Sequence, residues 1–222
     1  MPDIPYPSPD QDARICCILY LLVCTVLGMD ARERLIESAQ QLLWERGYVG
    51  MSPKAIQDRA SAGQGSMYHH FENKAALAST AIARSAEQLY EAARQEFAQP
   101  CSALDRIVSY LHRERDALRG CRVGRLTQDP EIIADPQLRR PVQEMFAKLT
   151  QELASLIVEG QSAGEFRAEI DPEDTASTIL AVLQGAYVLA RAANSTEPYD
   201  RAIAGAISLL KQQGDVKRAP RK

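Results

Sequence analysis

The stretch that decides the fold reads SPKAIQDRASAGQGSMYHHF and covers residues 52–71. Ser52 followed by Pro53 is typical of a helix N-cap and the first helical position, so this pair predicts the start of a short helix. The Ser, Ala and Gly at 61–63 predict a turn. A second short helix is expected over residues 64–70. Two short helices joined by a three-residue turn form a helix-turn-helix.

The second of these helices has an unusual composition for a core helix. Only Met67 and Phe71, four residues apart, are expected to face inward. The remaining side chains are hydrogen-bond donors and acceptors suited to phosphates and base edges. Gly65 would let the helix backbone approach DNA closely. The side-chain pattern therefore favours a DNA-reading helix, although many helical proteins contain short helix pairs.

Charge gives this interpretation no support. The whole chain of 222 residues has a net charge of −3, and residues 29–75 contain six basic and six acidic side chains. A nucleic-acid-binding domain is often strongly basic. Any DNA binding must therefore depend on where the polar and basic groups lie.

Helical periodicity continues on both sides of this motif. Residues 30–46 predict a supporting helix that Gly47 ends, and Asn73 is expected to cap a long helix over 74–98. Further helices are predicted over about 104–120, 136–164, 172–194 and 199–213, with an irregular segment at 121–133. No strand or internal repeat is indicated.

The expected fold is all-α, with nine helices. An N-terminal three-helix helix-turn-helix DNA-binding domain over 29–75 precedes a larger C-terminal helical domain over 76–213 for ligand binding and dimerisation. Residues 214–222 form a basic tail that is expected to be disordered.

The first 28 residues contain an apolar run over 15–28. A membrane-spanning helix needs roughly 20 apolar residues, so this run is short for that role. We expect Met29 to be the natural start and residues 1–28 to be a mis-assigned or disordered extension. The alternatives are a membrane anchor and a packed extension. The five cysteines are an odd number without metal-ligand spacing, which favours a reducing cytoplasm.

Residues 30–77 resemble the tetracycline-repressor (TetR) family of transcriptional regulators. The match follows Gly47-Tyr48, Ser52, Ile56, Ala60, the run from Gly65 to Phe71, Lys74 and Leu77. The resemblance implies phosphate or groove-edge contacts for Ser52 and Lys54, major-groove contacts for Gln64, Ser66 and His69, and backbone contacts for Tyr68, His70 and Lys74, with Gly65 allowing close approach.

The turn departs from the family pattern in two ways. Ser61 stands where the family usually has Gly, and Gly63 stands where a Ser or Ala cap is common. Gln64 also replaces a more common Lys or Pro. These differences affect the expected geometry of the turn and the preferred operator sequence.

For the C-terminal body, the resemblance implies a small-molecule effector and a homodimer. The polar or aromatic residues within apolar stripes are candidate ligand contacts, with Cys121 added from the family element below: Tyr110, His112, Cys121, Phe146, Gln184 and Tyr187. Small residues allow the last two helices to pack closely, either between subunits as a four-helix bundle or within one chain: Ala181, Gly185, Ala202, Gly205 and Ala206. A two-fold dimer would match a pseudo-palindromic, double-stranded operator.

The predicted function is that of a cytoplasmic, ligand-responsive repressor released from its operator by a small molecule, without enzymatic activity, cofactor or metal. One alternative is a thiol-based sensor of oxidants or electrophiles. Residues 120–124 resemble a Gly-Cys-x-x-Gly element of some family members, and Arg122 and Arg125 would lower the thiol pKa of Cys121. A second alternative is a membrane-tethered helical interaction protein. His69 and His70 are adjacent and diverge on a helix, so they do not suit one metal ion.

Overall fold

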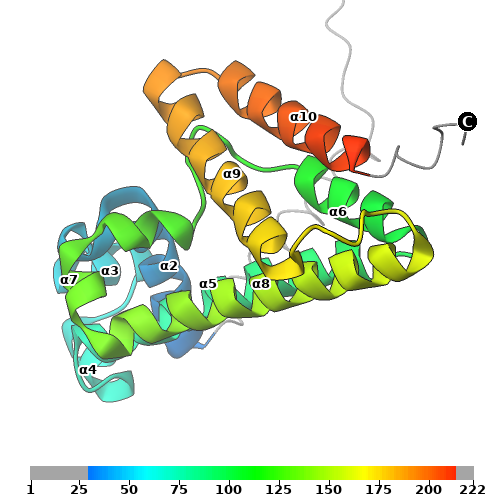
Figure 1. The fold of residues 1–222 in the computed structure, drawn as a ribbon. Helices are drawn as coiled ribbons and strands as arrows, with labels where there is room; N and C mark the ends of the chain where they lie inside the picture. Colours follow the sequence, from blue (N-terminus) through cyan, green and yellow to red (C-terminus); the bar gives the residue numbers. More distant parts are fainter. Residues whose placement is uncertain (1–29, 214–222) are drawn as a thin grey trace, which may run out of the picture.

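The computed structural model describes residues 30–213 of the chain. The expectations for residues 1–28 and for the tail at 214–222 lie outside this range. Within it the protein is entirely helical, with nine α-helices and one 3₁₀ helix, as the sequence predicts. A small group of helices occupies one end of the molecule, and longer helices form the body (Figure 1).

The N-terminal group consists of α2 (Ala31–Gly50), α3 (Pro53–Ala60) and α4 (Gln64–His70). The caps are those that the sequence predicts: the side chain of Ser52 accepts a hydrogen bond from the amide of Ala55, 3.1 Å away. One apolar cluster joins the three helices, and it includes Leu35, Ile36, Met51, Ile56 and Met67, all fully buried. These contacts position α3 and α4 as a rigid pair on α2.

Gly47 does not end α2 as expected but bends it. Its φ of 71° and ψ of −176° are not helical, and one further turn of helix follows as far as Gly50. A left-handed φ is costly for a residue with a Cβ atom, so this bend suits glycine. A Cβ at position 47 would also lie 2.9 Å from Oδ2 of Asp129. The bend therefore depends on glycine both for its backbone and for its space.

The departure from the family pattern at the turn has a structural cost. Ser61 ends α3 with φ 49° and ψ 44°, which is the left-handed conformation that glycine adopts most easily. Gly63, in contrast, is the N-cap of α4 with φ −64°, where other residues are equally comfortable. The turn is formed, and its strain falls on Ser61.

Ser61→Gly is expected to raise the free energy of unfolding by up to about 1 kcal/mol, because the left-handed conformation costs a non-glycine residue roughly 1–2 kcal/mol and part of that gain is lost to the greater freedom of unfolded glycine. Urea denaturation would measure the change. Ser162→Gly, at an exposed position inside a helix, is the matched control and should be destabilising. A Ser61→Gly protein less stable than the native chain would contradict the assignment of strain.

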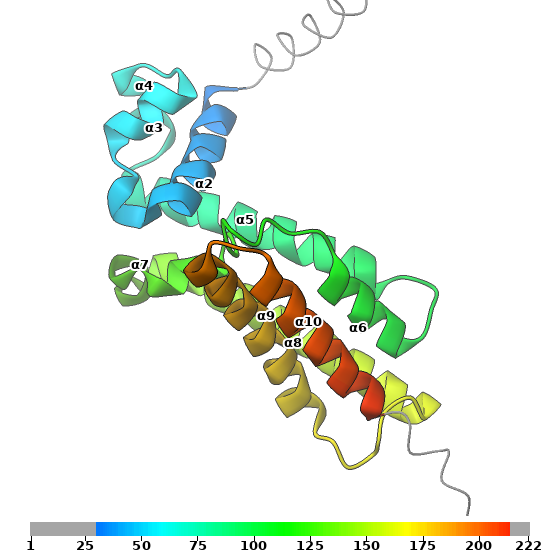
Figure 2. The ribbon, with the colours of Figure 1, turned by 90° about the horizontal axis from the view of Figure 1, so that it is seen from above.

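The helix α5 (Lys74–Phe97) belongs to both parts of the molecule. It starts beside α4, where the side chain of Asn73 caps it by accepting from the amide of Ala76 at 2.8 Å. It then passes under α2 and continues along the body to α6 (Figure 2). Its buried face carries Leu77 and Ile82 towards α2, and Ala93 and Phe97 further along. A displacement in the body can therefore reach the N-terminal group through this helix.

The body is a layered bundle of longer helices. α8 (Pro136–Ala163) packs against α5 and α9 (Pro172–Ala193), and α10 (Glu197–Gln212) packs against α9. The predicted stripe of α8 is buried as expected, and Gly164 ends that helix in a left-handed conformation. Between α6 and α8 the chain forms the short 3₁₀ helix η1 (Gly124–Gln128) and α7 (Pro130–Ala134), which lie towards the N-terminal group (Figure 1).

The prediction for the fifth helix was wrong at its C-terminal end. α6 runs over Ala103–His112 and does not continue to residue 120. The guanidinium of Arg115 donates to the carbonyl oxygens of Tyr110, Leu111 and Arg113 at 2.6, 3.1 and 2.8 Å. These carbonyls are the groups that a longer helix would have paired. The side chain of Arg115 thus replaces the next turn, and residues 113–120 form an irregular segment.

Candidate functional site

The two faces of α4 differ sharply in burial. Met67 is fully buried and Phe71, the residue that ends the helix, is 6% exposed, so these two side chains attach α4 to the rest of the domain. On the opposite side Tyr68 is 57% exposed and His69 is exposed. A Cβ at Gly65 would have no neighbour within 4 Å. The helix therefore presents an open surface on which a phosphate backbone or a groove edge can approach closely.

The remaining residues predicted to contact DNA lie around this face. Ser66 and His70 are half-buried on α4, and the rings of His69 and His70 are in edge contact with centroids 5.0 Å apart. Ser52 and Lys54 are exposed at the start of α3. The Nζ of Lys54 lies 3.7 Å from Oδ2 of Asp58 on the same helix, a weak exposed pair. Gln64 is the first residue of α4, and its side chain lies outside the described set.

Lys74 is less free than the sequence suggests. Its ammonium lies 3.9 Å above the ring centroid of Tyr48, and its side chain is half-buried at the start of α5. Burial lowers the pKa of Lys74, while the nearby carboxylates of Asp129 and Glu131 act in the opposite direction. A phosphate that binds Lys74 would therefore meet a cation already positioned by an aromatic ring.

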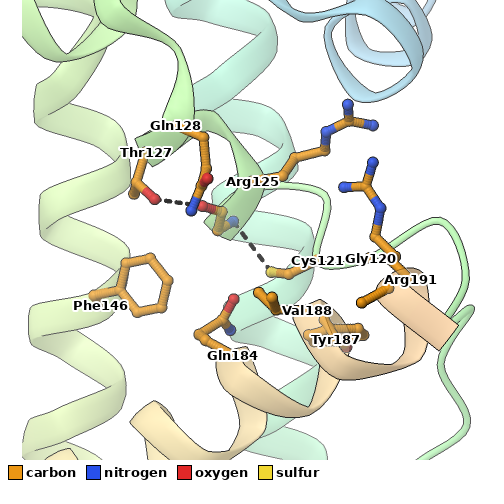
Figure 3. A pocket seen from close by; sticks show the side chains of 12 residues that line it. Gly120, Cys121, Arg125, Thr127, Gln128, Phe146, Gln184, Tyr187, Val188 and Arg191 are labelled. Atoms are coloured by element: carbon orange, nitrogen blue, oxygen red, sulfur yellow. Dashed lines mark hydrogen bonds between the residues drawn. The ribbon is translucent and has the colours of Figure 1, made fainter. Parts of the chain in front are cut away.

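A cavity of about 580 Å³ lies in the body, at the side that faces the N-terminal group. Figure 3 shows that side chains from η1 and the segment before it, from α8 and from α9 surround it. The residues that line it are Gly120, Cys121, Gly124, Arg125, Thr127, Gln128, Phe146, Gln184, Tyr187, Val188, Arg191 and Ala192. Its volume is within the usual range for small-molecule sites.

The cavity brings together four of the six predicted ligand contacts: Cys121, Phe146, Gln184 and Tyr187. The other two are elsewhere. Tyr110 is 3% exposed and packs against Phe97, with ring centroids 5.0 Å apart. His112 lines a separate small pocket with Tyr199 and Ile203. Tyr110 thus lies within the core, and its place in an apolar stripe indicated burial rather than ligand contact.

Sequence reasoning missed the charged and polar wall of the cavity. Arg125, Thr127 and Gln128 come from η1, and Arg191 comes from the last turn of α9. Burial lowers the pKa of Arg125, and the charges of Arg191 and Arg119 lower it further. Arg125 was adjacent to a motif already singled out. Arg191 gave no local signal, because it resembles any basic residue near a helix C-terminus.

Gly124 allows an unusually close approach in the cavity wall. A Cβ at this position would lie 2.1 Å from Oε1 of Gln184 and 3.2 Å from Cβ of Cys121. The amide of Gly124 donates to Sγ of Cys121 at 3.2 Å, and its carbonyl accepts from the hydroxyl of Thr127 at 2.7 Å (Figure 3). The glycine thus lets the Gln184 amide lie directly against the backbone of η1.

The segment that lines the cavity is attached to α2 through Trp44. The indole Nε1–H of Trp44 donates to the carbonyl of Gly120 at 3.1 Å, and its backbone carbonyl accepts from Arg125. The guanidinium carbons of Arg119 and Arg122 lie 3.4 and 4.6 Å from the centroid of its ring system. Trp44 is 8% exposed. Three arginines around one tryptophan therefore join the cavity wall to the DNA-binding domain.

A second attachment lies beyond the bend in α2. The amide of Tyr48 donates to Oδ2 of Asp129 at 2.7 Å, and Asp129 begins the segment between η1 and α7. This bond fixes the ring of Tyr48, which in turn lies under Lys74. The cavity wall and the predicted phosphate contact are thus connected through two neighbouring residues of α2 and α7.

An exposed helix pair on a three-helix unit, joined by one long helix to a helical body with a cavity, defines a helix-turn-helix regulatory protein. Two family models match the chain: "Bacterial regulatory proteins, tetR family" over residues 35–81, and "Tetracyclin repressor-like, C-terminal domain" over 101–206. The chain belongs to the TetR family of transcriptional regulators, as the resemblance in the sequence implied.

Individual relatives agree with this assignment. The HTH-type transcriptional repressor DhaR of Mycobacterium sp. (strain GP1) is 25% identical over 174 residues, which cover 77% of this chain and 87% of DhaR. The transcriptional regulator AcuR of Cereibacter sphaeroides is 29% identical over 169 residues, covering 72% and 76%. A crystal structure of a regulatory protein TetR from Rhodobacter sphaeroides superposes with a TM-score of 0.72 at 26% identity, covering 80% of this chain and 97% of that one.

Proposed function

We propose that this protein is a transcriptional repressor that binds a pseudo-palindromic operator as a homodimer and is released by a small molecule bound in the cavity. The observation that carries the proposal is the division of α4 into a buried apolar face and an exposed polar face. Such a helix has no reason within the folded chain to display Tyr68 and His69. Major-groove reading by this helix accounts for both features.

The proposed DNA interface comprises α4, the start of α3 and the start of α5. Ser66 and His69, with Gln64, would read base edges, while Tyr68, His70 and Lys74 would contact phosphates. Ser52 and Lys54 would contact the adjacent backbone or groove edge. The DNA-binding domain would then correspond to residues 29–75 and the effector and dimerisation domain to 76–213, with α5 continuing from one into the other.

A dimer would form through α9 and α10. Val188, Leu189 and Leu209 are 59%, 52% and 64% exposed on these helices. A Cβ at Gly185 or Gly205 would meet nothing within 4 Å, so neither glycine is required for packing within the chain. These observations favour packing against a second copy for those positions, whereas Ala202 and Ala206 are half-buried on the side towards the core.

Release would follow from the attachment of the cavity wall to α2. An effector that displaces Gly120 or Arg125 pulls on Trp44, and a displacement near Asp129 reaches Tyr48. Either movement would change the separation of the two recognition helices in a dimer. A coupling of about 1–3 kcal/mol is typical of such linked sites.

The two alternative functions gain no support from the family matches. For a thiol-based sensor, Arg122 and Arg125 were expected to act on Cys121, but both guanidiniums contact Trp44. For a membrane-tethered protein, the apolar run at 15–28 lies outside the described residues. Within residues 30–213, α9 alone has the length and hydropathy of a membrane-crossing helix, and it packs between α8 and α10. We propose a cytoplasmic regulator that acts without catalysis or cofactor.

Lys74→Ala is expected to weaken operator binding on every DNA sequence, because a phosphate contact carries no sequence information. Each phosphate neutralised adds about 0.9 to the slope of log K against log salt, so the slope should fall by about that amount. Fluorescence anisotropy with the DNA upstream of the gene, repeated over a range of salt concentrations, measures both effects. Lys211→Ala, near the end of α10, is the control and should leave the slope unchanged. If Lys74→Ala also leaves it unchanged, the proposed interface is wrong.

A further inference from the structure

The wall of the cavity carries two positive charges and no negative one. Arg125 and Arg191 both line it, and none of its lining residues is Asp or Glu. Figure 3 shows the two guanidiniums close to one another on the side towards α2. Among residues 30–213, neither arginine has a carboxylate within 4.0 Å, although most other arginines in this range are paired.

Two unneutralised guanidiniums at one cavity are costly without an anion. Each disfavours the charged form of the other, as the lowered pKa of Arg125 beside Arg191 indicates. The single hydrogen bond of Arg125 goes to a neutral carbonyl, that of Trp44. A carboxylate between the two arginines would accept charge-assisted hydrogen bonds from both and remove their repulsion.

The other side of the cavity is of different chemistry. The ring of Phe146 lies across the cavity from the guanidiniums, and Val188 lies between them on α9 (Figure 3). The Gln184 amide and the Thr127 hydroxyl occupy the intermediate positions. An inorganic anion would leave this apolar part unused. A molecule with a charged group at one end and an apolar body at the other would contact both parts.

We propose that the cavity binds a small organic acid, with its carboxylate held between Arg125 and Arg191 and its apolar portion against Phe146 and Val188. This inference rests on the proposed function only for its regulatory consequence. Because Arg125 also donates to the carbonyl of Trp44, the acid would compete with α2 for the same guanidinium. Binding of the acid would thereby loosen the attachment of the DNA-binding domain.

Isothermal titration calorimetry on the full chain tests this with butyrate, hexanoate and benzoate, each compared with its primary amide, and with inorganic phosphate. At least one acid should bind at millimolar concentration or below, and its amide should bind at least tenfold more weakly. Arg191→Gln should weaken binding of that acid by roughly 10- to 100-fold, as expected for the loss of a charge-assisted hydrogen bond. Arg191 is exposed, so this variant should fold.

Arg140→Gln is the matched control, because it removes the same charge from an exposed position on α8 and should leave affinity unchanged. Equal affinities for acid and amide, phosphate binding as tight as the acids, no binding of any acid, or an unaffected Arg191→Gln would each overturn the proposal. Operator binding by the same preparations is measured separately. A protein that binds its operator but no acid would fail this inference alone.

Discussion

Trp44→Ala is expected to lower the free energy of unfolding by about 3–5 kcal/mol, the usual range for truncating a buried tryptophan. It would remove the indole from between Arg119 and Arg122 and leave the carbonyl of Gly120 without its donor. The effect should be confined to the junction, because Trp44 is on the side of α2 that faces the cavity segment. Denaturation with urea, followed by circular dichroism, measures the change.

The same variant should also disconnect the two binding sites. In the native protein an effector is expected to reduce operator affinity by a factor typical of allosteric coupling, about 5- to 150-fold. In Trp44→Ala this factor should approach one, although the DNA-binding face of α4 is unaltered. Gel shifts with and without the tightest-binding acid measure the factor.

Trp44→Phe separates the two contributions of this residue. It keeps an aromatic ring for the guanidiniums and removes the Nε1–H that Gly120 accepts. We expect an intermediate stability and a coupling that is reduced but present. A Trp44→Ala protein with native stability and full coupling would show that the junction lies elsewhere.

Leu209→Glu is expected to turn the dimer into a monomer and to lower operator affinity by about 10²- to 10⁴-fold, the usual gain when two linked modules bind together. Leu209 is 64% exposed in the chain alone, so the substitution should have little effect on the fold of the monomer. In a two-fold interface the glutamates of both copies would be brought close together and desolvated, which is strongly unfavourable.

Analytical ultracentrifugation measures the association state, and fluorescence anisotropy measures the affinity for a full and a half operator. Val158→Glu, at a 50% exposed apolar position on α8, is the matched control and should leave both unchanged. If Leu209→Glu sediments as a dimer and binds the full operator normally, α9 and α10 do not form the interface.

The helix-turn-helix was predictable because its signals are local. Ser52, Pro53 and Asn73 specify helix starts through their own side chains or rings, and the structure confirms these starts. The long stripe of α8 was equally clear, since apolar periodicity over many residues has one interpretation. Even the unusual turn was located correctly, although the strain on Ser61 became visible only in its backbone angles.

The parts that sequence reasoning missed depend on contacts between segments distant in the chain or on competition for backbone groups. Arg115 ends α6 by taking its last carbonyls, and nothing in the periodicity distinguishes this arginine from a solvated one. Arg125 and Arg191 meet only because η1 packs beside α9. Tyr110 and Tyr187 look alike in sequence, yet one lies in the core and the other at the cavity.

Trp44 and Tyr48, four residues apart on α2, make the proposed effector site and the DNA-binding domain share a wall. Two equilibria that share residues in this way are thermodynamically linked, and linkage is reciprocal. Whatever factor the effector removes from operator affinity, the operator removes from effector affinity. The concentration of effector that triggers release is then set by the strength of each operator as well as by the cavity, so that one regulator would respond at different thresholds at different promoters.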